Sequence, residues 1–196
     1  MREEGLGGAV DFSRLFLRRA VRHGDRVVDA TCGRGRDTLF LAGLVGETGE
    51  VWAFDVQEEA LVETGARLWE AGCTSRVRLV HAGHECLSAH VPEPVRAVVF
   101  NLGYLPGNRE GIVTRSETTL SALDQACRLL APGGVIVLAV YTGHVGGEEE
   151  ATRIETWAEE LPSRDFNAWK SYQLNRSGSA PYVLVVEKMP RDGAHR

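Results

Sequence analysis

The chain has 196 residues and a formal net charge of −5; 43% of its residues are hydrophobic and 25% are charged. The length and composition predict one globular domain over residues 1–196, with a helical N-terminal region at 1–24. The negative net charge argues against a broad basic surface for nucleic acid, although a local basic patch can coexist with an acidic total. No apolar run approaches the roughly 20 residues that cross a bilayer, and the N-terminus lacks the basic and apolar regions of a secretory signal, so we expect a cytoplasmic protein without membrane contact.

Helical and strand-like segments alternate along the chain. Hydrophobic spacing, glycines and prolines predict helices at 11–23, 37–45, 57–72, 115–130 and 148–161, and strands at 26–31, 51–55, 77–81, 95–102, 135–141, 167–174 and 182–188. The segment Ala-Pro-Gly-Gly at 131–134 is expected to end the helix before it.

The order of these segments predicts the fold class. Repeated strand–helix units indicate a mainly parallel sheet with helices on both faces. Only a loop rich in Gly, Ser and Pro separates the last two strands, and this loop is too short for a helical crossover. We therefore expect these two strands to pair antiparallel, which gives an α/β sheet that ends in a hairpin.

The segment DATCGRGRDT, residues 29–38, follows the first predicted strand and precedes a helix. Loops in this place bind ligands in open α/β sheets. A phosphate-binding P-loop would need a Gly-Lys pair, and a dinucleotide fingerprint would need a third glycine where Thr38 stands. Neither is present. Cys32 and the other three cysteines lack metal-ligand spacing, so we expect reduced thiols and no metal.

A different pattern fits this loop better. Asp29 precedes Gly33 by four positions and Gly35 follows, so a carboxylate at the strand end lies next to a glycine turn. Such a carboxylate suits a cofactor that carries positive charge. Asp55 ends the second predicted strand, where an acidic side chain can accept hydrogen bonds from both ribose hydroxyls. Gln57 follows closely and is placed to lie beside an adenine.

These features resemble the class I S-adenosylmethionine-dependent methyltransferases. Their glycine motif is D/E-x-x-x-G-x-G, their second strand ends in an acidic residue, and their seven-stranded Rossmann-like sheet ends in an antiparallel hairpin strand. The resemblance assigns the methionine half of the cofactor to the Asp29 loop and the adenine to His84 or Glu85 after the third strand. A Rossmann-like domain for another nucleoside ligand is the alternative.

The fourth predicted strand ends in NLGYLPG, residues 101–107. Amino-methylating members of the superfamily hold N/D-P-P-Y/F there. An Asn carbonyl can accept N–H bonds from an amine and aim its lone pair, and an aromatic ring can stack on a base. Asn101 and Tyr104 match the outer positions, whereas Leu102-Gly103 replaces Pro-Pro. A plain turn at the strand end is the alternative.

Within the superfamily, the chain resembles small bacterial proteins labelled "putative rRNA methylases". The stretches NLGYLPG and YTGHVGG carry this resemblance, together with DTLFLA, AFDVQ, TTLSAL and VVEK. That family is linked to methylation of the aminomethyl group of 5-aminomethyl-2-thiouridine at the tRNA wobble position. The resemblance thus implies S-adenosylmethionine as cofactor and the anticodon stem-loop of tRNA as partner.

The site expected from these patterns and from the resemblance has three parts. The cofactor-binding residues are Asp29, Thr31, Gly33, Gly35, Asp37, Thr38, Asp55, Gln57, His84, Glu85, Asn101, Leu102 and Gly103. The catalytic residues are Asn101, Tyr104 and His144. The substrate-binding residues are Tyr104, Arg109, Arg115, Tyr141 and His144.

The basic residues leave several questions open. Candidates for RNA phosphate contacts are Arg14, Arg18, Arg19, Arg22, Arg109, Arg115 and Arg176. Arg34 and Arg36 stand where we expect Asn and His, and each could contact the cofactor carboxylate, RNA or solvent. The alternative functions are a small-molecule N- or O-methyltransferase, an rRNA methyltransferase, and a nucleotide-binding module without chemistry. A homodimer is also considered.

Overall fold

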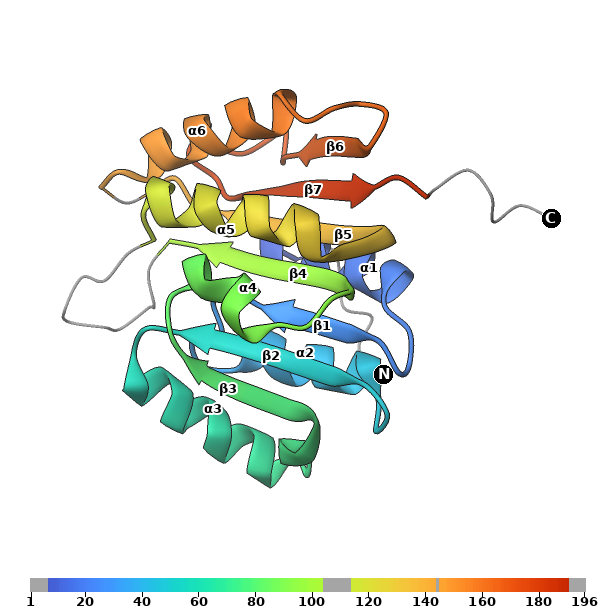
Figure 1. The fold of residues 1–196 in the computed structure, drawn as a ribbon. Helices are drawn as coiled ribbons and strands as arrows, with labels where there is room; N and C mark the ends of the chain where they lie inside the picture. Colours follow the sequence, from blue (N-terminus) through green and yellow to red (C-terminus); the bar gives the residue numbers. More distant parts are fainter. Residues whose placement is uncertain (1–6, 104–113, 144, 191–196) are drawn as a thin grey trace.

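The computed structural model describes residues 7–103, 114–143 and 145–190. These residues form one sheet of seven strands in the order β3-β2-β1-β4-β5-β7-β6 (Figure 1). The strands are β1 (Arg26–Asp29), β2 (Glu50–Asp55), β3 (Val77–His81), β4 (Val95–Leu102), β5 (Leu130–Val140), β6 (Phe166–Ser171) and β7 (Tyr182–Lys188). The α-helices are α1 (Ala9–Ala20), α2 (Arg36–Val45), α3 (Glu58–Glu70), α4 (Leu87–His90), α5 (Ser116–Leu129) and α6 (Gly147–Glu159), and the two short 3₁₀ turns are η1 (Thr74–Arg76) and η2 (His84–Cys86).

The predicted sheet is confirmed. Strands β1 to β5 pair in parallel, whereas β7 pairs antiparallel with both β5 and β6. The last strand of the chain therefore lies inside the sheet and β6 forms its edge. Composition explains this order, because the first five residues of β7, YVLVV, are buried, whereas β6, FNAWKS, is half-exposed.

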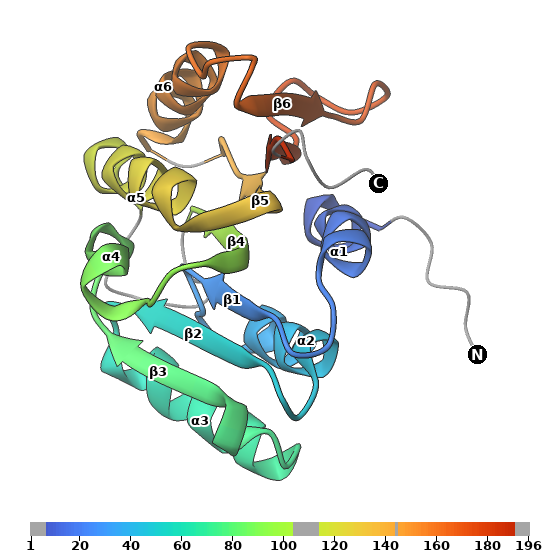
Figure 2. The ribbon, with the colours of Figure 1, turned by 45° about the vertical axis from the view of Figure 1, so that its right-hand side comes forward.

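Helices cover both faces of the sheet, as expected. Helices α1, α2 and α3 lie on one face, and α4, α5 and α6 lie on the other (Figure 2). Neighbouring residues of a strand point to opposite faces, so Val27 packs with Leu17 and Leu41 on the first face, whereas Val28 packs with Leu123 on the second. This burial of apolar side chains on both faces holds the layers together.

Several predicted boundaries were wrong. Helix α5 ends at Leu129 and β5 begins at Leu130, so the segment 131–134 belongs to the strand and does not close the helix. Val95 of β4 pairs with Leu130 of β5, but Ala97 pairs with Val135. Residues 131–134 of β5 therefore lie opposite a single residue of β4, and this irregularity in the pairing accommodates them. Strand β1 stops at Asp29 and β6 stops at Ser171, both earlier than expected, and the short helix α4 was not predicted.

The topology brings the site residues to one edge. The chain runs from β1 to β2 on one side and reaches β4 on the other side, so the carboxyl ends of these strands form the topological switch point, where open α/β sheets bind ligands. Asp29, Asp55 and Asn101 lie at or beside these ends, and Tyr141 follows the end of β5. None of the helices in the described ranges has the length and apolar character needed to cross a membrane.

Candidate active site

Asp29 fastens the end of β1 to the first turn of α2. Its side chain is fully buried; one carboxylate oxygen accepts a hydrogen bond from Thr38 Oγ1 at 2.7 Å and the other accepts one from Thr31 N at 3.3 Å. Burial, and then the nearby charge of Asp37, raises the pKa of Asp29 to about 7. The carboxylate therefore organises the base of the loop from within.

The glycine loop rests closely on α3. Gly35 has a φ of +72°, and a Cβ atom there would lie 2.7 Å from the Cγ2 and Oγ1 atoms of Thr64. Thr64 Oγ1 also donates a hydrogen bond to the carbonyl oxygen of Gly33 at 2.9 Å. Only glycine combines this backbone conformation with this close approach. Cys32 is buried beside the same threonine, and burial raises the pKa of its thiol far above the ordinary value.

The two arginines of this loop have different surroundings. The Arg34 side chain lies toward α3, where its Nε is 3.6 Å from the Glu63 carboxylate, and its carbonyl oxygen accepts a hydrogen bond from Arg67. Arg36 is exposed at the first position of α2. Arg34 thus contributes to the packing of loop and helix, and Arg36 faces solvent.

Asp55 connects the glycine loop with the start of α3. One carboxylate oxygen accepts a hydrogen bond from Gly33 N at 2.8 Å, and the other accepts one from Gln57 N at 3.0 Å. Each carboxylate oxygen has a second lone pair. The side chain can therefore accept hydrogen bonds from the two hydroxyls of a ribose while it holds the loop.

His84 contributes a buried polar atom near the strand ends. Its ring is 8% exposed and meets the Phe100 ring edge to face at 5.7 Å between centroids. Among the described residues, no group forms a hydrogen bond with His84 Nε2. Burial lowers the pKa of this imidazole, which favours the neutral ring. An unpaired buried nitrogen fits a polar atom of a ligand such as adenine. Glu85 is exposed, and its carboxylate folds back beside Gly83.

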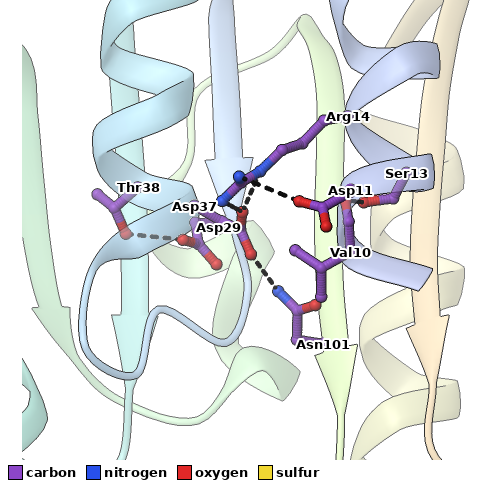
Figure 3. A network of polar contacts seen from close by, with 8 residues as sticks. All are labelled: Val10, Asp11, Ser13, Arg14, Asp29, Asp37, Thr38 and Asn101. Atoms are coloured by element: carbon purple, nitrogen blue, oxygen red, sulfur yellow. Dashed lines mark hydrogen bonds and ion pairs between the residues drawn. The ribbon is translucent and has the colours of Figure 1, made fainter. Parts of the chain in front are cut away.

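Asn101 is held at two points, and Figure 3 shows the one made by its side chain with Asp37. Its backbone N–H donates to Thr31 Oγ1 at 2.7 Å, and its side-chain Nδ2 donates to Asp37 Oδ2 at 2.8 Å. The other oxygen of Asp37 accepts two hydrogen bonds from Arg14 of α1, at 3.0 and 2.7 Å. Sequence patterns predicted Asp37 only as a cofactor-binding residue and Arg14 only as a phosphate contact, and they did not predict this network with Asn101.

A second network joins the end of β4 to α5 and α6. Gly103 and Thr114 are joined by two hydrogen bonds, from Gly103 N to Thr114 Oγ1 and from Thr114 N to Gly103 O. The buried carboxylate of Glu150 in α6 accepts hydrogen bonds from Thr114 Oγ1 and Thr119 Oγ1, both at 2.7 Å. The sequence did not single out Glu150, because it is the last of three consecutive glutamates at the start of a predicted helix, and such a run is typical of a solvent-exposed helix start.

The remaining candidates lie at the same edge or outside the described residues. Leu102 is buried and its carbonyl oxygen accepts a hydrogen bond from Tyr141 N. Burial, and then the charges of Asp37 and Asp11, raises the pKa of the Tyr141 hydroxyl. Arg115 is exposed at the start of α5. Three predicted residues lie outside the described ranges: Tyr104, Arg109 and His144.

The other predicted phosphate contacts are dispersed. Arg18 lies over the Phe40 ring at 5.0 Å, and Arg22 donates to carbonyl oxygens at the end of its own helix. Arg19 is exposed. Arg176 lines a cavity of about 510 Å³ between α6 and the connection from β6 to β7. The structure does not gather these side chains into one basic patch.

Comparisons with known proteins bear on this site. A model of the protein family described as "Putative rRNA methylase" matches residues 51–187. An Arabidopsis thaliana protein named tRNA (mnm(5)s(2)U34)-methyltransferase, chloroplastic, is 42% identical over 194 residues, which cover 94% of this chain and 70% of that protein. The similarity thus includes the glycine loop, the end of β4 and the hairpin.

Solved structures give the same result. A protein described as a putative rRNA-methylase from Clostridium thermocellum has a TM-score of 0.91 and 37% identity, over 95% of this chain and 100% of that chain. A putative methyltransferase from Streptococcus mutans, solved in complex with SAH, has a TM-score of 0.84 and 34% identity, over 92% and 97% of the two chains. Both similarities extend beyond the fold to the sequence of the whole domain.

Proposed function

This chain belongs to the family described as "Putative rRNA methylase" and is an S-adenosylmethionine-dependent methyltransferase; we propose that its acceptor is the aminomethyl nitrogen of 5-aminomethyl-2-thiouridine at the tRNA wobble position. The observation that carries this proposal is the sequence similarity over 94% of the chain to a relative whose name specifies that nucleoside. The Asn101 amide, fixed at the end of β4, supports an amine as the acceptor.

We assign the cofactor to the switch point between β1 and β4. The loop around Gly33 and Gly35 would hold the methionine half, Asp55 would accept the ribose hydroxyls, and His84 Nε2 would receive a polar atom of the adenine. The buried, unpaired nitrogen of His84 fits such a group. The other proposed cofactor contacts come from Thr31, Gln57, Glu85, Leu102 and Gly103. Asp29 and Thr38, which are fully buried, would act by holding the loop, and Asp37 by holding Asn101.

Positioning is the main contribution of the protein to the reaction. S-adenosylmethionine, when bound, would supply a sulfonium methyl group to the amine nitrogen. The electron pair of the broken carbon–sulfur bond would stay on sulfur, and the methylated amine would release its extra proton to water. Asn101 Oδ1 would accept a hydrogen bond from an N–H group of the amine and so direct the nitrogen lone pair toward the methyl carbon. Holding two reactants in line can supply much of a rate enhancement.

The RNA would approach over the same edge of the sheet. Arg115 at the start of α5 and Arg109 are proposed to contact phosphates of the anticodon stem-loop. Tyr104 is proposed to stack on the unstacked base, and Tyr141 and His144 to line the substrate entrance. A homodimer and a cytoplasmic location stay predictions.

The proposal is tested on the nucleosides of tRNA. The purified protein is incubated with S-adenosylmethionine and tRNA that carries 5-aminomethyl-2-thiouridine, and the digested nucleosides are analysed by mass spectrometry. We expect the mass gain of one methyl group on that nucleoside alone. Methylation of rRNA or of a small metabolite, with the tRNA unchanged, would replace this proposal with the corresponding alternative.

A further inference from the structure

We propose that Asp37, held by Arg14, is a positioning residue that fixes the orientation of the Asn101 amide for methyl transfer. The proposal rests on the function proposed above, because it concerns how Asn101 meets the amine. It assigns a role in the reaction to α1, which precedes the first strand of the sheet (Figure 3).

The chemistry of the two side chains determines the orientation. An ionised carboxylate accepts hydrogen bonds and cannot donate them, whereas an amide has a donor end and an acceptor end. The contact of 2.8 Å between Asn101 Nδ2 and Asp37 Oδ2 therefore requires the NH₂ group of Asn101 to face Asp37. The acceptor end, Oδ1, then points away from Asp37 and is available to an amine N–H.

Without Asp37, the amide of Asn101 would have two orientations. The backbone of Asn101 is fixed by its hydrogen bond to Thr31 Oγ1, but that bond does not distinguish the two ends of the side chain. A rotation of the amide would present NH₂ to the amine, and two donors would then face each other. The hydrogen bond to a carboxylate also polarises the amide and strengthens Oδ1 as an acceptor.

Arg14 holds Asp37 in the required position. Its Nε and Nη2 atoms both donate to Asp37 Oδ1, and the exposed fractions of the two side chains are 26% and 12%. The guanidinium is itself held by Asp11 at 3.6 Å and by the Phe40 ring at 5.0 Å. A charge-assisted pair of this kind fixes geometry more firmly than a single neutral hydrogen bond. Each oxygen of Asp37 thus has its own donor.

The variant Asp37→Asn tests the orientation. It keeps the size of the side chain, but its carbonyl oxygen must face Arg14, so its NH₂ group faces Asn101. The Asn101 amide then turns its carbonyl toward residue 37 and its NH₂ toward the substrate. We expect kcat for the tRNA to fall about a hundred-fold, the scale of one lost oriented hydrogen bond, with the Kd for S-adenosylmethionine nearly unchanged.

The exchange variant D37N/N101D gives the rescue. The amide at position 37 donates to the carboxylate at position 101, whose second oxygen again accepts from the amine. We expect this double variant to recover at least ten-fold in kcat over D37N. The single variant N101D, in which two carboxylates face each other, stays impaired. A merely structural role of Asp37 would not produce this dependence on the exchange.

Controls and a second variant keep the result interpretable. Asp165→Asn changes an exposed aspartate just before β6, at the opposite edge of the sheet, and should leave kcat unchanged. If D37N does not fold, Arg14→Gln is used, and we expect a lower kcat with an unchanged Kd for S-adenosylmethionine. The proposal is overturned if folded D37N or R14Q keeps the wild-type kcat, or if the exchange variant recovers nothing.

The wild-type reaction separates this proposal from the function on which it rests. A wild-type protein that binds S-adenosylmethionine but leaves the tRNA nucleoside unmethylated contradicts the proposed function, and the proposal about Asp37 falls with it. A wild-type protein that methylates the nucleoside, together with an unimpaired D37N, contradicts only the role of Asp37.

Discussion

Single residues at the strand ends are expected to have separable tasks in this enzyme. Asp55 binds backbone N–H groups on both sides of the proposed ribose position, whereas Asn101 reaches the proposed transfer site through β4. The first should act on cofactor affinity and the second on turnover. Their separation follows from their places on different strands of the same sheet.

Substitution of these two residues by alanine should separate binding from turnover. We expect Asp55→Ala to weaken S-adenosylmethionine binding, since the ribose loses its acceptors and the loop loses an anchor. Asn101→Ala should keep the affinity and lower kcat. Calorimetric titration with S-adenosylmethionine and steady-state kinetics measure the two effects. An equal loss of affinity in both variants would contradict the assigned roles.

Asp29 should give the free energy of unfolding a dependence on pH. Its pKa is raised from 3.8 to about 7, so the folded state carries an ionisation cost that is absent below pH 4, grows between pH 4 and 7, and is complete above pH 7. Asp29→Asn removes this cost, which is at most a few kcal/mol because one pKa unit is about 1.4 kcal/mol.

Denaturant unfolding at pH 5 and pH 8 measures this effect. Relative to wild type, Asp29→Asn should gain more stability at pH 8 than at pH 5. The control Asp165→Asn removes an exposed carboxylate that pairs with the neighbouring, exposed Arg164, and it should show no such gain. A stability difference between Asp29→Asn and wild type that is independent of pH would contradict the role of burial.

At the scale of elements, the packing of α3 against the glycine loop explains the second glycine of the motif. Gly35→Ala adds a Cβ atom at 2.7 Å from Thr64 and strains a residue with φ of +72°. The backbone strain alone costs about 1 kcal/mol, and the contact adds to it. We expect lower stability in denaturant unfolding and weaker cofactor binding.

The double variant G35A/T64A separates the two contributions. It removes the contact but retains the strain, so it should recover part of the lost stability after correction for Thr64→Ala alone. No recovery would show that the contact with α3 is unimportant.

Glu150 joins α6 to Thr114 and to Thr119 of α5. Its removal in Glu150→Ala leaves the hydroxyls of Thr114 and Thr119 without their acceptor. We expect a loss of about 1–3 kcal/mol in the free energy of unfolding, together with a lower kcat because the end of β4 loosens. Glu149→Ala, which changes an exposed residue one position earlier, should have little effect. Equal behaviour of the two variants would contradict a role for Glu150.

At the scale of the whole molecule, net charge limits how RNA can be bound. The chain carries a net charge of −5, and the arginines of α1 are engaged with Asp37, with Phe40 or with their own helix, or are exposed singly. A small number of phosphate contacts therefore has to suffice. Recognition would then depend on base stacking and on the shape of the site more than on a basic surface.

This predicts a shallow dependence of tRNA binding on salt. Each phosphate contact to single-stranded RNA changes the slope of log K against log salt by about 0.7, so a few contacts give a slope of roughly −2 to −3. Arg115→Ala should reduce the magnitude of this slope by about 0.7, the contribution of one phosphate contact. Binding measured by fluorescence anisotropy over a salt series tests this. A steep slope that is unaffected by this substitution would point to another basic surface.

The fold was predictable because its signals are local. Alternating strands and helices, the short last connection and the glycines of the loop all lie within a few residues of the feature that they predict. The errors lie at the boundaries, such as the segment 131–134, where proline and glycine indicate the end of a helix while pairing with β4 makes the segment part of β5.

The sequence by itself determined the sheet class, the glycine loop after the first strand and the polar residues at the strand ends. The tertiary structure decided which of these side chains act together. Arg14 and Asp37 are 23 positions apart, Asp37 and Asn101 are 64 apart, and Thr114 and Glu150 are 36 apart. No local pattern relates residues at such distances, since their contacts arise only when the helices pack on the sheet and the parallel strands align their carboxyl ends at one edge.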